Sequence, residues 1–391
     1  SHNISLSRDH WRKQMANERL RIGIVGANGE NDRWGAKAHI PAALSIDEVE
    51  LVAVATSREE SAKIAQQKSG SRLAFSNYHD LVTSPEVDLV TISVRVAMHY
   101  PIVMEAIAAN KHVFCEWPLA LNSGQASSML HSANLAGIGH AIGTQSRFSP
   151  GLMYMKQLVD AGSIGEPLMF NITHHLGTMP AMPSHRWWLL RKEEGGGVTL
   201  VTTGHAIDIA RWILGDVKAV CGKATTFVKE VQFKNNLTAL PETEFNKVSA
   251  FDSICFSVEM ESGVLGIAST SIVCKGWGGF RFEIQGTEGR LVAETSDMIQ
   301  YSNAKIWIAS ARGGYRPTEL KELPIPLEFT SVHTLSNTSM GFHIAQELRA
   351  FVNSIQNGER DFSPGFKEGF DLHRIIEAII RSSDTESWEK V

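Results

Sequence analysis

Cysteine is scarce in this chain of 391 residues, and its four copies are widely separated, at Cys115, Cys221, Cys255 and Cys274. No Cys-x-x-Cys pair is present, which argues against a zinc site and against a redox dithiol. We expect mostly buried, free thiols in a reducing compartment, and therefore a cytoplasmic protein.

Long apolar runs and an excess of positive charge are also lacking. No stretch is long enough to span a bilayer, and the first twenty residues lack the apolar centre of a signal peptide. The net charge of −5 gives no electrostatic reason to expect nucleic acid or an anionic membrane as a partner. The 43% hydrophobic content and the length predict a globular protein of two domains.

The first part of the chain alternates apolar strands with helices. The expected strands are Arg21–Ala27, Glu50–Ser57, Val87–Val94, Lys111–Trp117 and His140–Ser146, and the helices are Glu59–Lys68, His99–Asn110 and Ser123–Gly137. Continuous apolar strands between helices predict a parallel sheet covered on both faces. We predict a doubly wound Rossmann domain at residues 20–148, preceded by an extension at residues 1–19.

After Pro150 the pattern changes to strands with few helices between them. The expected strands are Leu168–Leu176, Asp216–Val228, Asp252–Met260, Gly263–Val273, Phe280–Gly286 and Arg290–Ser296, and the helices are Gly151–Gly162, Thr199–Leu214, Gly341–Gln356 and Lys367–Ser383. This pattern predicts an α/β domain at residues 149–391 with an open, largely antiparallel sheet.

A glycine-containing turn follows the first strand. Gly26 permits the tight turn, and a helix from about Trp34 directs its amino end at a pyrophosphate. Asn28 replaces the second glycine of the usual motif, and asparagine tolerates left-handed backbone. We predict that Gly26, Asn28 and Gly29 bind a dinucleotide. The alternative is a glycine-rich turn without a ligand.

The end of the second strand bears on the choice of cofactor. An Asp or Glu is expected there for NAD, but Thr56, Ser57 and Arg58 occupy these positions. Ser57 and Arg58 can hold a 2′-phosphate, which favours NADP over NAD. Alternatively, Arg58 is a solvated residue at a helix start, and Glu59 reaches the ribose.

Three further polar residues stand where strands of the parallel sheet end, which is where ligands bind in open α/β sheets. Gln145 is expected near the nicotinamide. Arg147 either binds a hydroxyl or carboxylate of the substrate or fixes the domain boundary. His99 either lines the cofactor cleft or is a helix-start histidine without a ligand.

Several motifs occur in a characteristic order. They are AKAHIPA after the glycine turn, then VRVAMHY, CEWPLALN, GTQSRFSP, GGGVTLVTTGHAIDIARWILG and FEIQGTEGRL. From Leu20 to the carboxyl terminus the chain resembles the Gfo/Idh/MocA oxidoreductases. The resemblance implies an NAD(P)-dependent reaction at a secondary alcohol or ketone of a sugar or polyol, and a homo-oligomer that associates through the open sheet.

The resemblance also identifies site positions. Trp117 stands where the family carries a lysine, and Val201 where it carries an aspartate, whereas His205 matches the family's histidine. Glu116 is expected to contact the ribose or nicotinamide end of the cofactor. Glu-Trp in place of Glu-Lys also occurs in the fungal galactose-pathway co-repressor branch, which is similar at residues 34–42, 96–100 and 201–208.

Hydride transfer at a carbinol carbon needs a group that takes the hydroxyl proton, and His205 has a suitable ordinary pKa. Thr202 shares a helix face with His205 and is expected to bind it or the substrate. Trp117 can stack on a sugar ring or on the nicotinamide, or simply fill the core. His205 itself has an alternative as a buried histidine bonded to a backbone carbonyl.

Adjacent His174 and His175 point to opposite faces of a strand and have no nearby Cys or carboxylate in the sequence, so we predict no metal site. The leading interpretation is an oxidoreductase with His205 as acid/base. The second is a dinucleotide-binding regulator without turnover that acts through a protein partner. A third keeps the cofactor but runs another reaction, such as redox-assisted elimination.

Overall fold

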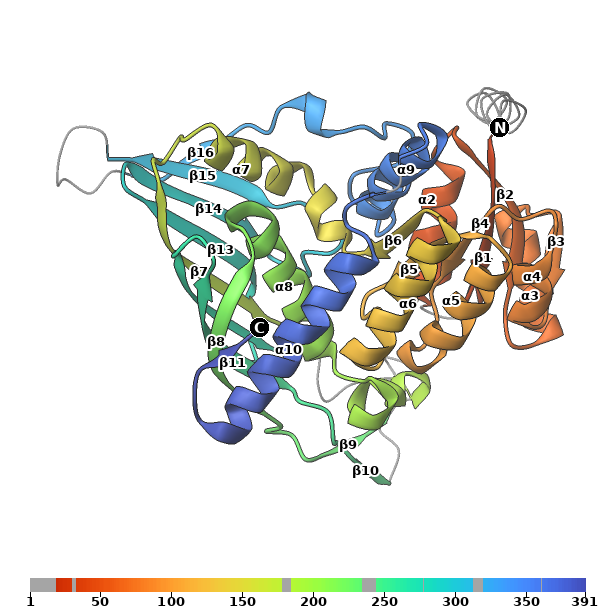
Figure 1. The fold of residues 1–391 in the computed structure, drawn as a ribbon, viewed down its shortest axis with the longest axis horizontal. Coiled ribbons are helices and arrows are strands. Elements are labelled where there is room, and N and C mark those ends of the chain that lie inside the picture. Colours follow the sequence, from red (N-terminus) through yellow and green to blue (C-terminus); the bar gives the residue numbers. More distant parts are fainter. Residues whose placement is uncertain are drawn as a thin grey trace. The chain divides into compact units, whose positions relative to one another are not determined.

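The computed structural model describes residues 19–29, 33–177, 184–233, 244–276, 278–311, 319–359 and 361–391. The chain forms two compact units. Unit 1 consists of residues up to Ala120, Gly124–Gln145 and Ser331–Phe370, and unit 2 consists of Leu121–Ser123, Ser146–Thr330 and Asp371–Val391. We describe each unit by itself (Figure 1).

Unit 1 contains a parallel sheet of six strands in the order β3-β2-β1-β4-β5-β6. The strands are β1 (Leu20–Val25), β2 (Val49–Ala55), β3 (Leu73–Phe75), β4 (Leu89–Ile92), β5 (His112–Glu116) and β6 (His140–Gly143). Strands β4 and β6 are buried at every residue, as a parallel sheet covered on both faces requires. The predicted Rossmann sheet is confirmed.

The helices of unit 1 include one segment from far along the chain. They are the π-helical turn η1 (Gly35–His39), α2 (Ile40–Leu44), α3 (Glu59–Ser69), α4 (Tyr78–Thr83), the 3₁₀ turn η2 (Val96–Met98), α5 (His99–Ala108), α6 (Ser123–Ala136) and α9 (Phe342–Gln356). Helix α9 packs Leu348 and Phe351 into the same core as Ile22 and Phe114. Truncating a buried phenylalanine such as Phe351 to alanine typically costs about 3–5 kcal/mol.

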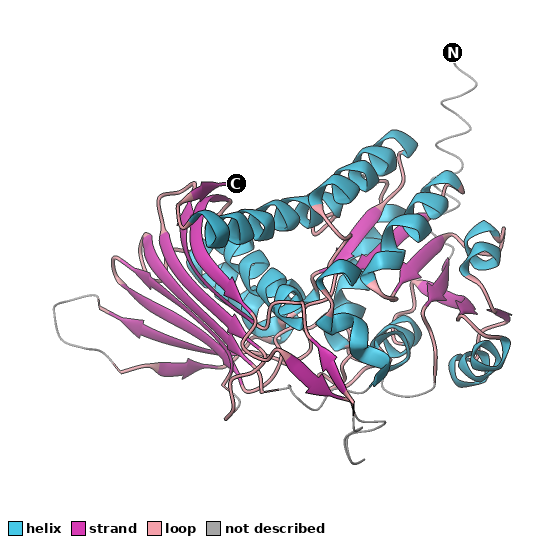
Figure 2. Cartoon of the chain, turned by 90° about the horizontal axis from the view of Figure 1, so that it is seen from below, coloured by secondary structure: helices cyan, strands magenta, loops and turns pink. Residues whose placement is uncertain are grey.

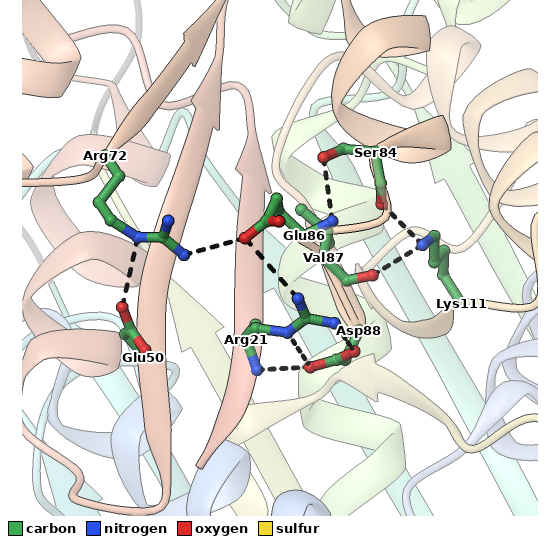
Figure 3. Close-up of polar contacts among 8 residues, drawn as sticks. All are labelled: Arg21, Glu50, Arg72, Ser84, Glu86, Val87, Asp88 and Lys111. Carbon is green, nitrogen blue, oxygen red and sulfur yellow. Dashed lines mark hydrogen bonds and ion pairs between the residues drawn. The ribbon is translucent and has the colours of Figure 1, made fainter. Parts of the chain in front are cut away.

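Ion pairs occupy the amino ends of the strands (Figure 3). Arg21 on β1 bonds both carboxylate oxygens of Asp88, at 2.8 and 2.9 Å, and lies 3.8 Å from Glu86. Burial opposes the ionisation of Asp88, but the hydrogen bonds and charge of Arg21 outweigh it and lower the pKa of that carboxyl group. The ammonium of Lys111, just before β5, donates to the Ser84 and Val87 carbonyls at 2.8 and 2.7 Å.

Unit 2 is built on a nine-stranded sheet in the order β16-β15-β14-β13-β7-β12-β11-β8-β17. Its strands are β7 (Pro167–His175), β8 (Val217–Thr225), β11 (Ser253–Met260), β12 (Leu265–Ser271), β13 (Gly279–Gly286), β14 (Gly289–Thr295), β15 (Lys305–Ser310), β16 (Lys321–Leu323) and β17 (Glu389–Lys390). Strands β9 (Glu230–Gln232) and β10 (Phe245–Lys247) form a separate pair. Only β7 and β12 run parallel among the described strands of the large sheet, which confirms the largely antiparallel sheet.

Helices cover one face of this sheet (Figure 2). They include α7 (Pro150–Asp160), α8 (Val198–Leu214) and α10 (Phe366–Thr385), and shorter 3₁₀ turns are η3 (Gln145–Phe148), η4 (Ser184–Leu190), η5 (Lys192–Glu194) and η6 (Leu327–Phe329). Helix α8 contacts β7, β11 and β12. Phe170, Ile172 and His174 of β7 face this covered side and are fully buried, whereas Asn171 and Thr173 are exposed on the other side.

The structure differs from the sequence predictions in two respects. Residues 331–370 pack with unit 1, although the expected second domain began at residue 149 and ran to the end of the chain. All four cysteines are free, but only Cys115 is buried; Cys255 and Cys274 are exposed, so the expectation of mostly buried thiols was wrong. Residues 1–18 of the expected extension lie outside the described residues. No helix in the described part of the chain could cross a membrane.

Candidate active site

The glycine turn of unit 1 has the backbone shape that a dinucleotide requires. Gly26 has a φ of +95°, and a Cβ there would lie 2.0 Å from the Ser93 carbonyl oxygen. A Cβ on Gly35 would meet the Gly26 carbonyl oxygen at 2.4 Å. Both positions therefore exclude side chains, and they keep the turn after β1 close to the helical segment that begins at Trp34.

The rest of this loop is partly fixed by α3. The Lys68 ammonium donates to the Gly29 carbonyl at 2.6 Å. Asn28 is half-buried, and residues 30–32 are outside the described part. The Gly26 amide donates to the Ala55 carbonyl at 3.0 Å, so this turn is tied both to β2 and to α3.

The end of β2 presents exposed side chains at Ser57 and Arg58. Arg58 precedes α3 with extended backbone. The Thr56 hydroxyl donates to the Arg58 carbonyl at 2.8 Å, and this hydrogen bond fixes the turn between β2 and α3. Glu59 forms an exposed ion pair with Lys63 at 2.8 Å. This pair engages the carboxylate of Glu59, the residue expected as the alternative ribose contact.

Glu116, at the end of β5, is held by a residue that the sequence analysis did not single out. Nε2 of His39 lies 2.6 Å from Oε1 of Glu116, and both side chains are largely buried. Gly143 on β6 leaves the necessary room, since a Cβ there would approach Oε1 to 3.0 Å. The carboxylate of Glu116 therefore has a fixed orientation.

His99 has a structural role that the prediction of a cofactor contact missed. The ring is buried, with Nδ1 2.8 Å from the Pro118 carbonyl oxygen and Nε2 3.1 Å from that of Val94. Burial lowers its pKa, and the two carbonyl groups act in the opposite direction. Because both nitrogens face backbone, His99 braces the segment after Trp117 instead of presenting a nitrogen to a cofactor.

Trp117 and Gln145 are both buried at this carboxyl end of the sheet. Trp117 precedes Pro118, and the peptide bond between them is cis. Oε1 of Gln145 is buried without a hydrogen-bond partner in the described structure. A buried carbonyl of this kind destabilises the fold by about 1–3 kcal/mol unless a ligand or water bonds to it, which fits the expected place near a nicotinamide amide.

In unit 2, the structure brings His205 together with Ser146, a second residue that the sequence analysis missed. Both are buried, and the Ser146 hydroxyl lies 3.0 Å from Nδ1 of His205. If the serine oxygen accepts from Nδ1–H, Nε2 carries the lone pair and can act as a base. Thr202 is fully buried one turn earlier on α8, and Val201 is half-buried.

Arg147 does not bind a substrate group in the described geometry. Its guanidinium forms a two-point ion pair with Asp208 of α8, at 2.7 and 2.5 Å, and both side chains are buried. A buried, paired guanidinium of this kind is strongly destabilising to break. The predicted substrate contact is therefore wrong, and the alternative role of fixing the start of unit 2 onto α8 agrees with the structure.

His174 and His175 lie on opposite faces of β7, as expected for neighbours on a strand. Nε2 of His175 is 2.9 Å from the Ser269 hydroxyl. His174 is buried beside Phe280, with ring centroids 5.5 Å apart and an edge-on geometry. Among the described residues, no group of three or more His, Cys, Asp or Glu side chains is arranged to hold a metal ion.

Comparison with known proteins places these features in a family. Residues 20–139 match the model of an oxidoreductase family with an NAD-binding Rossmann fold, and residues 152–292 match the Gfo/Idh/MocA C-terminal domain. The chain belongs to the Gfo/Idh/MocA family of oxidoreductases. The resemblance expected from its motifs is thereby confirmed, and an NAD-binding Rossmann domain is part of that family description.

Individual relatives include both enzymes and a regulator. Myo-inositol 2-dehydrogenase of Thermotoga maritima is 28% identical over 276 residues, which cover 70% of this chain and 75% of that one. Levoglucosan dehydrogenase of Pseudarthrobacter phenanthrenivorans is 25% identical, with coverages of 86% and 88%. The galactose/lactose metabolism regulatory protein GAL80 of Saccharomyces cerevisiae is 31% identical over 205 residues, which cover 50% and 47%.

A solved structure is similar over nearly the whole chain. The NAD binding oxidoreductase of Klebsiella pneumoniae superimposes with a TM-score of 0.80 at 27% identity, covering 96% of this chain and 99% of that one. The similarity to GAL80 supports the link to the co-repressor branch that the Glu-Trp motif suggested.

Proposed function

We propose that the protein is an NAD(P)-dependent oxidoreductase that acts on a secondary alcohol or ketone of a sugar or polyol. The observation that carries this proposal is the buried pair of Ser146 and His205, 3.0 Å apart. It gives a member of an oxidoreductase family an oriented acid/base group, although Trp117 and Val201 replace two residues common in that family. The inositol and levoglucosan dehydrogenases among its relatives support the substrate class.

The residues of unit 1 fit a nicotinamide dinucleotide. Gly26 and Gly35 allow the tight packing of the turn after β1 against the following helical segment, and the buried Oε1 of Gln145 can accept from a carboxamide. We propose that Glu116, whose carboxylate lies 2.6 Å from His39, contacts the ribose or nicotinamide end of the cofactor. Bound here, the cofactor supplies the hydride acceptor or donor.

We favour NADP over NAD within this proposal. Ser57 and Arg58 are exposed at the end of β2, where a 2′-phosphate lies in dinucleotide-binding folds. Glu59 is occupied by Lys63. Equal calorimetric affinities for the two cofactors would contradict this preference.

In oxidation, Nε2 of His205 would accept the proton of the substrate hydroxyl group, and the carbon that bears this group would lose its hydride to the bound cofactor. Ser146 accepts from Nδ1–H both before and after the transfer, so it supports the neutral and the protonated ring alike. Thr202 is proposed to bind the substrate from the same helix face. Trp117 cannot carry a proton, and its indole offers an apolar wall for a sugar ring or the nicotinamide.

A second candidate function is a dinucleotide-binding regulator that does not turn over and acts through a protein partner. It is favoured by Trp117 and Val201, which remove two polar side chains from the usual site, and by the similarity to GAL80. The two functions share the cofactor and differ in whether His205 does chemistry.

The deciding experiment follows nicotinamide absorbance with NAD(H) and NADP(H) and a panel that includes myo-inositol and levoglucosan. For the enzyme, we expect turnover that falls about 10²–10⁴-fold in His205→Ala, with unchanged cofactor affinity by calorimetry. Tight cofactor binding without turnover, together with turnover gained in the Trp117→Lys, Val201→Asp double variant, would establish the regulator instead.

We also propose a homo-oligomer that associates through the uncovered face of the sheet in unit 2. On that face Met169, Leu265 and Ile267 are 43%, 50% and 49% exposed, and Met169 and Leu265 are register partners on β7 and β12. Exposed apolar patches on a sheet favour association. Light scattering should show an oligomer that Ile267→Glu dissociates; a monomeric wild type would refute it.

A further inference from the structure

His174 stands apart from the other buried histidines of the chain. It is 0% exposed on the covered face of β7, and neither ring nitrogen has a hydrogen-bond partner of normal geometry in the described structure. By contrast, Nε2 of His39 lies 2.6 Å from a carboxylate oxygen of Glu116, and Nδ1 of His140 accepts from the Phe366 amide at 3.1 Å. A buried ring without partners destabilises the resting fold.

The surroundings of His174 are polar on one side. Its register partners are Thr270 on β12 and Phe280 on β13, and the Thr270 hydroxyl lies 2.6 Å from that of Thr203 on α8. The backbone carbonyl of Thr202 faces the ring, and His205 is near enough to act on it electrostatically. The ring therefore belongs to the same polar cluster as the proposed acid/base residue.

The ring is neutral at physiological pH. Burial, reinforced by the neighbouring His205, lowers the pKa of His174 to about 3, with a smaller effect in the same direction from His175 on the opposite face; the Thr202 carbonyl opposes them. A neutral imidazole offers one N–H donor and one lone pair. A hydroxyl group can accept a hydrogen bond from the N–H or donate one to the lone pair, so it can bond either nitrogen of this ring.

We propose that His174 is a second substrate-binding residue, whose neutral ring bonds a hydroxyl group of the polyol or sugar beside His205. The proposal rests on the proposed oxidoreductase function. The unpartnered ring nitrogens of His174 in the core of unit 2 then serve ligand binding. His174 on β7 would provide a polar contact that Val201 on α8 cannot make.

The first test is thermal unfolding of His174→Leu and His174→Phe in the full-length protein. If the buried imidazole serves ligand binding and destabilises the fold, its removal should stabilise the protein. We therefore expect a rise in Tm of about 3 °C in at least one of the two variants. The matched control is His140→Leu, which removes a buried ring that makes hydrogen bonds and should lower Tm. A fall in Tm in both His174 variants would overturn the inference.

The second test measures turnover with myo-inositol and levoglucosan, using whichever cofactor the wild type accepts. In His174→Leu we expect kcat/KM to fall at least 100-fold, carried largely by KM, with cofactor affinity unchanged. His174→Gln keeps a donor and an acceptor and should recover part of the loss. His175→Gln, on the opposite face of the strand, should stay within threefold of wild type.

The outcomes separate the two proposals. An active wild type whose His174 variants stay within threefold of its kcat/KM would overturn the role of His174 and leave the proposed function intact. A wild type that binds the cofactor but is inactive on the whole panel would overturn the proposed function, and this inference with it.

Discussion

The two ends of the parallel sheet in unit 1 are built from the same strands but differ in how their polar groups are satisfied. At the amino ends, Arg21, Asp88 and Lys111 are bonded to charged or carbonyl partners (Figure 3). At the carboxyl ends, Gly26 forms a tight turn with a φ of +95° that excludes a side chain, and Gln145 keeps a buried oxygen without a partner. One end stabilises the fold, and the other keeps a buried polar atom without a partner, which we assign to ligand binding.

The largest expected effect tests the carboxyl end. Gly26→Ala places a Cβ 2.0 Å from the Ser93 carbonyl oxygen at a φ of +95°, so it should abolish dinucleotide binding and lower the unfolding free energy by about 3 kcal/mol or more. The matched control is Gly70→Ala, where φ is +70° but nothing lies within 4 Å; a cost of about 1 kcal/mol and intact binding are expected. Calorimetry and denaturant unfolding measure both.

The next effect tests the amino end. Asp88→Asn removes the charge that pairs with Arg21, and since both side chains are partly exposed, we expect a loss of about 1–2 kcal/mol with unchanged cofactor affinity. Glu59→Gln breaks a fully exposed pair with Lys63 and should leave Tm unchanged. Weaker cofactor binding in Asp88→Asn would show that the two ends of the sheet are coupled, and would contradict the separate roles that we assign to them.

Acid titration is a measurement in which the two ends should behave alike. Burial lowers the folded-state pKa of His99 at one end and of His112 at the other. The unfolded chain then binds more protons below about pH 6.5, so stability is full above that pH and falls as the pH drops, by up to ~1.4 kcal/mol per pH unit for each group.

Asp88 responds in a different window. Its folded-state pKa is lowered, so its contribution to stability is present above its ordinary pKa of 3.8 and is lost only at lower pH.

Urea unfolding at pH 7.5, 5.5 and 4.5 should show the loss of stability that the histidines cause, and His112→Gln should make the dependence on pH less steep. An unchanged slope in that variant would contradict the assignment.

The smallest effect on stability is expected for Gln145→Leu, which removes the unsatisfied oxygen. The free energy of unfolding should stay within about 1 kcal/mol of the wild-type value or increase, while cofactor affinity falls about tenfold. A large loss of stability would mean that Gln145 serves the fold, and the contrast between the two ends would then fail.

The sequence predicted the sheet of unit 1 well because buried parallel strands are continuous apolar runs. It missed β3 (Leu73–Phe75), which has only three residues and no distinct pattern. The return of α9 to unit 1 was missed as well, because an amphipathic helix shows that one face is buried but not against what.

Candidate site residues could be proposed from the sequence where a residue type has one evident chemistry, as at Gly26 and His205. Pairings were not, because they join residues far apart in the chain: His39 and Glu116 are 77 positions apart, and Ser146 and His205 are 59 apart. Arg147 was misjudged for the same reason, since its partner Asp208 lies on a helix 61 residues later. A single sequence contains no signal for such contacts.

The place of residues 331–370 has a consequence for biosynthesis. Because Leu348 and Phe351 complete the core around Ile22 and Phe114, the core of unit 1 stays incomplete during synthesis until α9 has emerged from the ribosome. A fragment that ends near residue 148 lacks α9, so the apolar surface that this helix covers would be exposed to solvent. We expect such a fragment to bind chaperones or aggregate instead of folding on its own.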